Sequence, residues 1–170
     1  MSDRTAQIDA LFNQEYVSLS RLAFLLTGDA SIAEELTMEA FARALVGWRR
    51  IGAMERPDLY VRRIVVNLCA SSLRRRAIEQ RVIARLAAKD RSAVEVSPTI
   101  EPAIYRAVKE LPVRQRACVV LRYFEDRSEP EVADVLNCSV GTVKSQLARA
   151  RTRLERELRF LAEPAGDHDE

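Results

Sequence analysis

The sequence predicts an all-α fold of two small helical domains joined by a flexible linker, the second of them a four-helix domain that contains a helix-turn-helix. Apolar residues recur at helical spacing through most of the chain, and no segment alternates as a strand would. The 170 residues include only 5 glycines, with 48% hydrophobic and 31% charged residues, a composition typical of a folded, helix-rich protein. The stretch 89–99 lacks bulky apolar residues and ends in Ser-Pro, which indicates a linker.

These observations set the expected domain boundaries. We expect a first domain at 1–80, a linker at 81–100, a second domain at 101–163 and an acidic tail at 164–170. Domains of this size bury only a modest apolar core.

The first two helices are marked by signals at their ends. The apolar period of the first helix runs to Leu26 and stops at Thr27-Gly28, a helix C-terminal signal. Ser31 with Glu34 predicts a capping box at the start of a strongly amphipathic second helix. Its inward face is predicted to comprise Leu36, Ala40, Phe41, Ala44, Leu45 and Trp48. Its opposite face is predicted to comprise Glu35, Thr37, Met38, Glu39 and Arg43.

A loop and a long helix complete the first domain. Residues 51–56 have no apolar period and predict a loop, after which Pro57 and Asp58 start a helix. Its inward residues are predicted to be Val61, Ile64, Val65 and Leu68, and its partly exposed ones Tyr60, Arg62, Arg63 and Asn67. The arginine run at 74–76 fits a solvated helix face and a nucleic-acid backbone equally well. Residues 77–88 are expected to extend the helix with frayed ends.

Two prolines open the first helices of the second domain. Pro102 begins a helix that reaches Leu111, and Pro112 begins the next. The apolar stripe of that next helix comprises Val113, Ala117, Val120, Leu121 and Phe124.

Residues 128–154 are predicted to form the helix-turn-helix. Ser128 and Glu131 are spaced as a capping box, and Asn137 tolerates the left-handed backbone of a sharp turn. Ser139 can then cap the second helix. The buried face of this helix is predicted to comprise Val140, Val143, Leu147 and Leu154, and the outward face Gly141, Lys144, Ser145, Ala148 and Arg149.

That outward face is small, polar and basic, which suits the major groove of DNA. Gly141 permits close approach, and Lys144 and Arg149 can reach phosphates or guanine edges. Thr142, in place of a Glu, leaves the positive helix N-terminus available to a phosphate. The alternative is a plain helical hairpin with a solvated basic face, and we favour DNA binding. The net charge is only +2, but arginines gather at 49–50, 62–63, 74–76 and 149–159.

The composition argues against several other classes of protein. Cys69, Cys118 and Cys138 form no CxxC pair, and the single His168 lies in the tail. We therefore expect no metal site, no catalytic residue, no enzyme activity and no cofactor, with the cysteines as small buried hydrophobes. No run approaches the roughly 20 apolar residues of a membrane span and no targeting segment is visible, so we expect a cytoplasmic protein without membrane insertion.

Two motifs resemble the extracytoplasmic function class of sigma factors, the two-domain members of the sigma-70 family. Two segments of the chain resemble the family's second conserved region: EELTMEAFARAL and PDLYVRRIVVNLCASSLRRR. A third segment resembles the family's fourth conserved region: LPVRQRACVVLRYFEDRSEPEVADVLNCSVGTVKSQLARARTRL. The two motifs occur in the family's order and cover nearly the whole chain apart from linker and tail. Within the family, YVRRIVVNL is most similar to actinobacterial members.

The resemblance implies a factor that binds core RNA polymerase and directs initiation at promoters. The first domain would dock on the clamp helices of the β′ subunit and read the −10 element, while the second would read the −35 element near the β flap. The implied polymerase contacts are Glu35, Met38 and Glu39; the implied −10 contacts are Arg56, Tyr60, Arg63 and Asn67; the implied −35 contacts are Gly141, Thr142, Lys144, Ser145 and Arg149. An inhibitory anti-sigma partner is common in this family, although no residue here identifies one.

Three residues depart from the family's usual pattern. Met38 stands where a Gln is more frequent, which makes the expected clamp contact more apolar. Ser71 or Ser72 replaces an Asp, which changes local ion pairing, and Asn137 replaces the common turn Gly.

A pocket for an extruded base and an alternative function are also expected from the sequence. We hypothesise that the loop at 51–56 forms the pocket and that Asn67 supplies an amide to read the base edge. The alternative function is an autonomous helix-turn-helix repressor or response-regulator output domain. Such a protein would bind a palindrome without polymerase.

Overall fold

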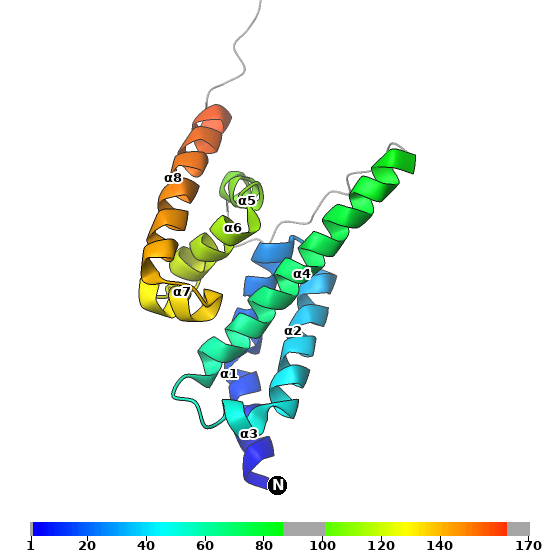
Figure 1. Cartoon of the computed structure of the whole chain (residues 1–170), viewed down its shortest axis with the longest axis vertical. Helices are drawn as coiled ribbons and strands as arrows, with labels where there is room; N and C mark the ends of the chain where they lie inside the picture. Colours follow the sequence, from blue (N-terminus) through cyan, green and yellow to red (C-terminus); the bar gives the residue numbers. More distant parts are fainter. Residues whose placement is uncertain (1, 87–100, 163–170) are drawn as a thin grey trace, which may run out of the picture.

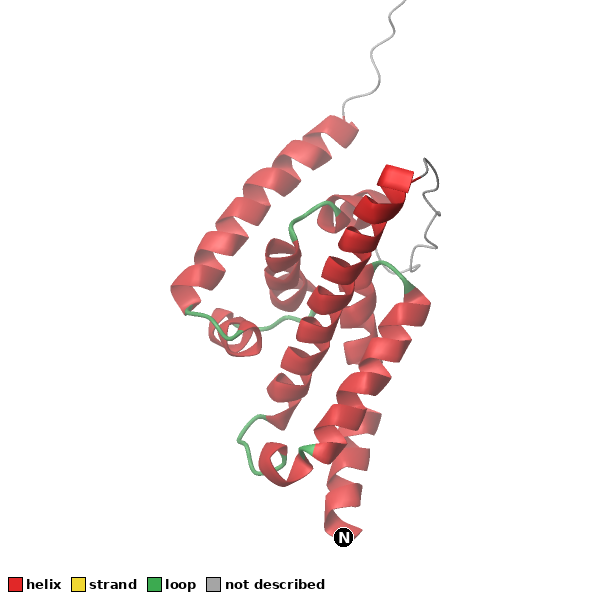
Figure 2. Cartoon of the chain, turned by 45° about the vertical axis from the view of Figure 1, so that its right-hand side comes forward, coloured by secondary structure: helices red, strands yellow, loops and turns green. Residues whose placement is uncertain are grey.

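A computed structural model describes residues 2–86 and 101–162, and every element in these ranges is a helix (Figure 1, Figure 2). The elements are α1 (Ser2–Thr27), α2 (Ala30–Val46), α3 (Trp48–Ile51), α4 (Pro57–Leu86), α5 (Pro102–Lys109), α6 (Val113–Val119), the π-helical turn η1 (Val120–Phe124), α7 (Glu129–Leu136) and α8 (Val140–Ala162). The all-α prediction is confirmed. The predicted linker segment at 89–99 and the acidic tail lie outside the described residues.

Helices α1, α2 and α4 pack side by side as a bundle whose apolar faces meet in its centre (Figure 1). Leu19 and Leu22 of α1 and Val65 of α4 are fully buried there. Phe12 and Phe41 meet edge to face with ring centroids 4.8 Å apart, an arrangement that aromatic pairs favour. None of the helices within 2–86 and 101–162 is both long and apolar enough to cross a membrane.

The start of α2 differs from the predicted capping box. Gly28, at φ +73, ends α1 as predicted, and the next residue, Asp29, is the N-cap whose carboxylate accepts from the Ile32 amide at 3.0 Å. The Ser31–Glu34 box was therefore wrong. The tight glycine turn already places Asp29 in the extended conformation that an N-cap needs, so the helix begins two residues earlier.

The inward face of α2 was also predicted with two errors. Leu45 is 55% exposed, whereas Thr37 is fully buried because its hydroxyl donates to the Ala33 carbonyl at 2.7 Å and so needs no water. Trp48 is buried as expected, although it lies in the separate helix α3 after the break at Gly47. Ile51, predicted as loop, ends α3 with 2% exposure.

The long helix α4 begins at Pro57 as predicted and continues to Leu86, past the expected domain boundary at 80. One prediction on it was wrong: Arg62, expected to be partly exposed, is only 1% exposed. Three carboxylates surround its guanidinium, and they compensate the charge that burial removes from water.

The helix-turn-helix has the predicted local structure. Ser128 and Glu131 form the complete capping box of α7, and Asn137 ends the helix in the left-handed conformation at φ 51 and ψ 53. The Ser139 hydroxyl then accepts from the Thr142 amide at 3.1 Å and caps α8.

The buried face of α8 largely follows the predicted register. Val143 and Leu147 are buried, while Val140 and Leu154 pack against the core with part of their surface exposed.

The cysteines mostly follow the prediction. Cys69 and Cys118 are each 1% exposed, and burial raises the pKa of their thiols to about 12 and about 11. Both are therefore protonated at neutral pH. Cys138, at the turn before α8, is half-buried.

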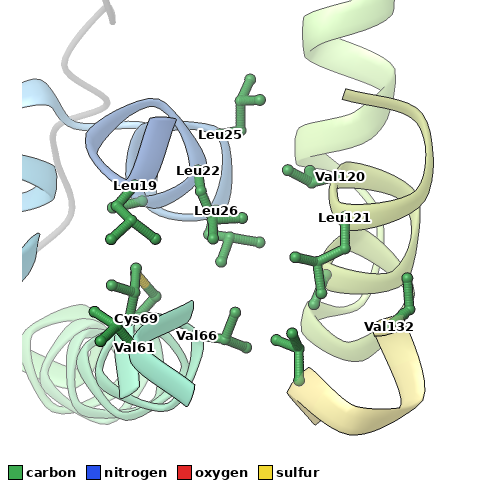
Figure 3. Close-up of a cluster of buried hydrophobic side chains, with 14 of the residues drawn as sticks. Leu19, Leu22, Leu25, Leu26, Val61, Val66, Cys69, Val120, Leu121 and Val132 are labelled. Carbon is green, nitrogen blue, oxygen red and sulfur yellow. The ribbon is translucent and has the colours of Figure 1, made fainter. Parts of the chain in front are cut away.

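The two domains pack closely against each other, an arrangement that the sequence reasoning did not predict. Helix α4 runs along α7, and the C-terminal half of α1 lies against η1 (Figure 1). Figure 3 shows Leu26 of α1 and Val66 of α4 on one side of the junction and Val120 and Leu121 of η1 on the other, with Val132 of α7 lying beyond Leu121. All five are buried, so one apolar core runs through both domains.

Candidate nucleic-acid interface

The outward face of α8 is open to solvent. Gly141, Lys144, Ser145 and Arg149 are exposed, and only Thr142 among the predicted −35 residues is half-buried. Lys144 lies 3.7 Å from a carboxylate oxygen of Glu129, a loose pair at the surface. The face therefore offers two exposed cations beside small side chains, as contact with a DNA groove requires.

The N-terminus of α8 is capped more fully than the sequence indicated. Besides accepting from the Thr142 amide, the Ser139 hydroxyl lies 2.9 Å from the Thr142 hydroxyl. Ser145 in turn donates to the Thr142 carbonyl at 2.9 Å. These hydroxyls hold the first turn in place. One proton of the Ser139–Thr142 pair is left to donate to a phosphate, and Ser145 keeps lone pairs that can accept from a base.

Helix α4 carries a second basic surface, centred on Tyr60. The phenol of Tyr60 accepts from Arg50 at 2.7 Å, and the guanidinium groups of Arg50 and Arg63 each lie 5.6 Å from the ring centroid. Such cation–π contacts fix the ring and both cations relative to each other. The result is a pre-formed platform of one aromatic ring and two positive charges.

A cavity of about 260 Å³ adjoins this platform. Its lining residues are Arg43, Gly47, Arg50, Ile51, Tyr60, Ile64 and Asn67. Asn67 was predicted to line a pocket here, and it does. The loop was predicted to supply the rest, but among residues 51–56 only Ile51 contributes. The end of α2 and helix α3 form the wall instead, a contribution that the sequence reasoning missed.

The predicted polymerase contacts share one outward face of α2. Glu35, Met38 and Glu39 are all exposed, and Glu39 is paired with Arg43 at 2.7 Å. Leu45 lies seven residues after Met38 and so on the same side of the helix. Because these two side chains are 49% and 55% exposed, an apolar strip continues the predicted contact toward the end of α2. Sequence reasoning missed it by placing Leu45 in the core.

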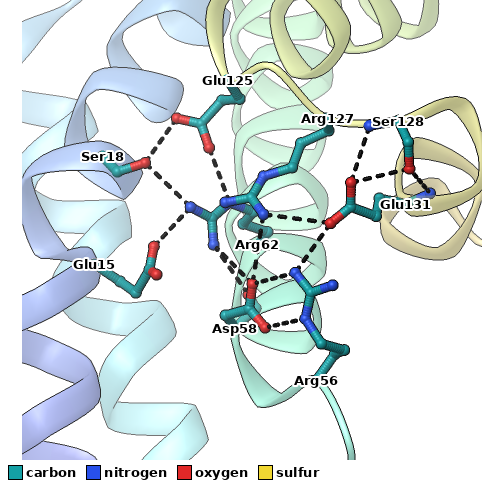
Figure 4. Close-up of polar contacts among 9 residues, drawn as sticks. All are labelled: Glu15, Ser18, Arg56, Asp58, Arg62, Glu125, Arg127, Ser128 and Glu131. Carbon is teal, nitrogen blue, oxygen red and sulfur yellow. Dashed lines mark hydrogen bonds and ion pairs between the residues drawn. The ribbon is translucent and has the colours of Figure 1, made fainter.

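Arg62 lies at the centre of a polar cluster between the domains (Figure 4). Its guanidinium donates to Glu15 at 2.6 Å, to Glu125 at 2.8 Å and to the Ser18 hydroxyl at 3.1 Å, and it lies 3.6 Å from Asp58. Burial alone would lower the pKa of Arg62, but the hydrogen bonds and charges of Glu125 and Glu15 outweigh it and the pKa is raised. Arg62 therefore stays fully charged inside the protein.

A second set of ion pairs joins the start of α4 to α7. Arg56 donates to Asp58 and to Glu131, each at 3.0 Å, and Arg127 lies 3.7 Å from Asp58. The backbone amide of Ser128, with further hydrogen bonds from its hydroxyl and Arg56, holds the pKa of Glu131 at about 2 against the opposing effect of burial. Arg63 donates to the Asp134 carbonyl from Nε, at 3.1 Å, and from Nη2. Two predicted −10 residues, Arg56 and Arg63, are thus engaged by the second domain.

Comparisons with known proteins agree with the two-region organisation. The family model for sigma-70 region 2 matches residues 11–78, and that for sigma-70 region 4 matches residues 102–154. The solved sigma factor RpoE from Bartonella quintana, in complex with the anti-sigma factor NepR, has the same fold: TM-score 0.71 and 21% identity over 90% of this chain and 97% of that one. CnrH in complex with the cytosolic domain of CnrY gives a TM-score of 0.65 and 21% identity, over 92% and 90%.

Relatives of established identity match most of the chain. The RNA polymerase sigma-E factor of Streptomyces coelicolor is 33% identical over 150 residues, 85% of each chain. The sigma factor SigM of Mycobacterium tuberculosis, of the extracytoplasmic function (ECF) class, is 35% identical over 161 residues, 94% of this chain and 80% of the relative. These organisms are actinobacteria, the group that YVRRIVVNL indicated. Nothing in the comparisons supports an autonomous repressor. The protein belongs to the sigma-70 family, within its extracytoplasmic function class.

Proposed function

We propose that this chain binds core RNA polymerase and directs it to promoters by recognising a −35 and a −10 element. The observation that carries the proposal is the exposed basic face of α8, a helix-turn-helix second helix whose opposite face is buried. A second basic surface with an adjoining cavity lies on α4 of the same chain. The protein acts by binding and catalyses no reaction of its own, and its place of action is the cytoplasm.

The −35 element is the proposed ligand of α8. Lys144 and Arg149 lie on one exposed side of the helix, at a spacing that lets one contact a phosphate while the other reaches a guanine edge. Gly141 and Ser145 are small, so the helix axis can approach the groove floor. Thr142, at the first turn, is placed to donate to a phosphate at the positive end of the helix.

The −10 element is the proposed ligand of the platform on α4. A base extruded from the stack would enter the cavity beside Tyr60, where Asn67 can read its edge. The volume of about 260 Å³ is just below the roughly 300–1,000 Å³ of pockets for drug-sized ligands, which suits one base. Arg56 and Arg63 would contact the strand on either side, once the second domain has released them.

The outward face of α2 is the proposed polymerase contact. Glu35 and Glu39 supply negative charge, and Met38 with Leu45 supplies apolar area between and beyond them. An anti-sigma protein is a further proposed partner, because the solved sigma factor RpoE, which has this fold, is in complex with the anti-sigma factor NepR and masking this face would block polymerase.

Run-off transcription with core polymerase on a pool of promoters, with and without this protein, tests the proposal. We expect initiation that depends on the protein and starts at promoters sharing one −35/−10 pair. A lack of initiation, together with tight binding of the protein alone to a palindrome, would overturn it. The triple substitution Glu35→Lys, Met38→Glu, Glu39→Lys separates the two activities: it should abolish initiation while leaving the affinity of α8 for a −35 duplex unchanged.

A further inference from the structure

A second cavity, of about 340 Å³, lies between the two domains. One wall comes from α4, and the others come from α6, the end of α7 and the first two turns of α8. It shares only Asn67 with the cavity beside Tyr60. Small-molecule sites often lie where two domains meet, and this volume falls within the roughly 300–1,000 Å³ of such sites. The cavity is therefore large enough for a small ligand.

The two charged residues among the described lining of this cavity are both arginines. Arg74 comes from α4 and Arg114 from α6, and the same lining includes no aspartate or glutamate. Within residues 2–86 and 101–162, neither of these two cavity arginines has an ion pair. Arg74 has a long hydrogen bond of 3.4 Å to the Ser71 hydroxyl, and Arg114 has no hydrogen bond in that part of the chain. Two cations from different domains thus border one space without a negative partner.

Other arginines at the junction between the domains are paired with carboxylates. Arg62 pairs with Glu125, and Arg127 pairs with Asp58. The cavity arginines differ from them because the chain supplies no anion. Like charges at the border of one cavity repel each other, and an anion between them offsets that repulsion. An anion from outside the chain is therefore the partner that this arrangement lacks.

Apolar side chains of both domains form much of the remaining lining. They are Val66 and Ala70 of α4, Val113 and Ala117 of α6, and Leu136 of α7. Ala70 lies four residues before Arg74, and Ala117 lies three residues after Arg114, so each alanine shares a helix face with one of the cations. An apolar group can therefore lie directly beside a charged one.

We propose that this cavity binds a small organic anion, with a carboxylate or phosphate head between the two cavity arginines and an apolar body against Ala70 and Ala117. Guanidinium groups bind both kinds of head through paired hydrogen bonds. Asn67 and Gln146 also line the cavity, and their amides can donate to the remaining oxygen atoms of the head. The site does not depend on the proposed recognition of promoters.

Two cysteines of the lining report on the occupancy of the cavity. Cys118 is 1% exposed, and burial raises the pKa of its thiol to about 11, while the charge of Arg114 acts to lower it. Arg114 is therefore close enough to influence a group in the cavity wall. Cys138 is half-buried in the same wall. It is the thiol of this pair that a reagent can reach, and a bound ligand would shield it.

Four small molecules test the head and the body of the ligand separately. Octanoate and octyl phosphate combine an anionic head with an apolar body, acetate has the head alone, and 1-octanol has the body with a neutral head. Isothermal titration calorimetry on the free, full-length protein measures the affinity of each. We expect octanoate and octyl phosphate to bind at one site per chain, and acetate and 1-octanol to bind at least about tenfold more weakly. The tighter of the two anions identifies the preferred head.

Substitutions in the lining locate the site. Arg74→Gln and Arg114→Gln should each weaken octanoate binding about tenfold, because each removes a charge-assisted hydrogen bond. Ala70→Leu should abolish binding by filling the cavity. Arg75→Gln is the matched control, since Arg75 is exposed on the same helix and does not line the cavity. Circular dichroism should show equal helix content in all variants; if Ala70→Leu unfolds, the two arginine variants decide.

Alkylation of Cys138 gives a second measurement of the same site. N-ethylmaleimide is added with and without octanoate, and mass spectrometry follows the modification of Cys138 over time. At about ten times its Kd, octanoate should slow this modification by up to about tenfold, because roughly nine molecules in ten are then occupied. The same concentration of acetate should leave the rate unchanged.

Several outcomes would overturn the proposal. They are the absence of binding by both octanoate and octyl phosphate at millimolar concentration, and binding of acetate or 1-octanol that is equally tight. Octanoate binding that survives both arginine substitutions, or that falls equally with Arg75→Gln, would place the ligand elsewhere. Unchanged alkylation of Cys138 in the presence of bound octanoate would do the same. The sigma-factor function is decided by the run-off experiment and stands or falls independently of these results.

Discussion

The two proposed DNA-binding surfaces are built from similar residues but differ in what lies against them. On α8, Lys144 and Arg149 are exposed to solvent, whereas Arg56, just before α4, and Arg63, on α4, are held by oxygen atoms of α7. Similar residue types on two helix faces can therefore differ in their partners, because the neighbouring domain contacts one face and leaves the other exposed. In this chain, Lys144 and Arg149 are exposed, whereas Arg56 and Arg63 are engaged by the second domain.

Among the substitutions that test this comparison, Arg62→Ala is expected to have the largest effect, on the free energy of unfolding. Removing the cation leaves Glu15, Asp58 and Glu125 together in a buried site, and breaking a buried ion pair from one side costs about 3–5 kcal/mol. The free energy of unfolding, measured with denaturant, should fall by that amount. Arg75→Ala, an exposed arginine of the same helix, should change it by less than about 0.5 kcal/mol. A loss below about 1 kcal/mol for Arg62→Ala would mean that water already solvates the three carboxylates.

Arg62 also shows where sequence reasoning reaches its limit. Features that depend on neighbours a few residues apart were predicted correctly: the capping box of α7, the left-handed Asn137 and the Ser139 cap all follow from local hydrogen bonds. Arg62 was expected to be partly exposed, and arginine side chains are rarely fully buried unless they are paired. Its burial depends on Glu125, which lies 63 residues later in the chain. The spacing of apolar residues along the sequence carries no information about such a distant pair.

The wrong predictions in the first domain also arose because the outcome depends on the folded surroundings of a residue, here on neighbours closer in the sequence. Asp29 and Ser31 are both good N-caps by type, and only the backbone turn at Gly28 decides between them. Thr37 was assigned to the outward face of α2 because it is a polar residue type. Its hydroxyl donates to the Ala33 carbonyl, so Thr37 is buried in the core, and Leu45 is exposed instead. A prediction of the cavity wall from Arg43 to Ile51 would have required knowing that the chain folds back between α2 and α4.

The accessible surface can be tested by Arg149→Ala. If Arg149 reads a base edge, the substitution should cost about 1–3 kcal/mol in affinity for the correct −35 duplex and should relax the preference at one base pair. Because this surface is open in the free chain, the loss should be equal with and without polymerase. Arg151→Ala, also exposed on α8, is the control and should leave base preference unchanged. A uniform loss on all sequences would instead identify Arg149 as a phosphate contact.

The free energy of unfolding should fall in acid because Glu131, which accepts from Arg56, becomes protonated. Its pKa is held at about 2 in the folded chain, below the ordinary value of 4.5, so ionised Glu131 stabilises the fold fully above about pH 4.5. This stabilisation is lost as the pH falls from about 4.5 toward 2. Glu131→Gln should lower the free energy of unfolding by about 1.5 kcal/mol at pH 7 and should flatten its decline in acid. The control Glu129→Gln should keep the wild-type pH profile; if it flattens as well, Glu131 is not the group that titrates.

The smallest effect is expected from Asn67→Ala, which tests the −10 pocket alone. Asn67 is exposed and lines the cavity beside Tyr60, so its removal should not disturb the fold. The loss of one amide contact to an extruded base should cost about 1 kcal/mol, a roughly fivefold slower formation of open complexes in a permanganate footprinting time course. Affinity for core polymerase should be unchanged, and Ser71→Ala, one turn further along α4, should behave as wild type. Since the cavity beside Tyr60 is lined by first-domain residues, the defect of Asn67→Ala should persist unchanged when Glu125→Gln, which removes the charge that Arg62 contacts across the domains, is added. A defect that disappears in the double variant would show that Asn67 acts through the contact between the domains and not in reading the base.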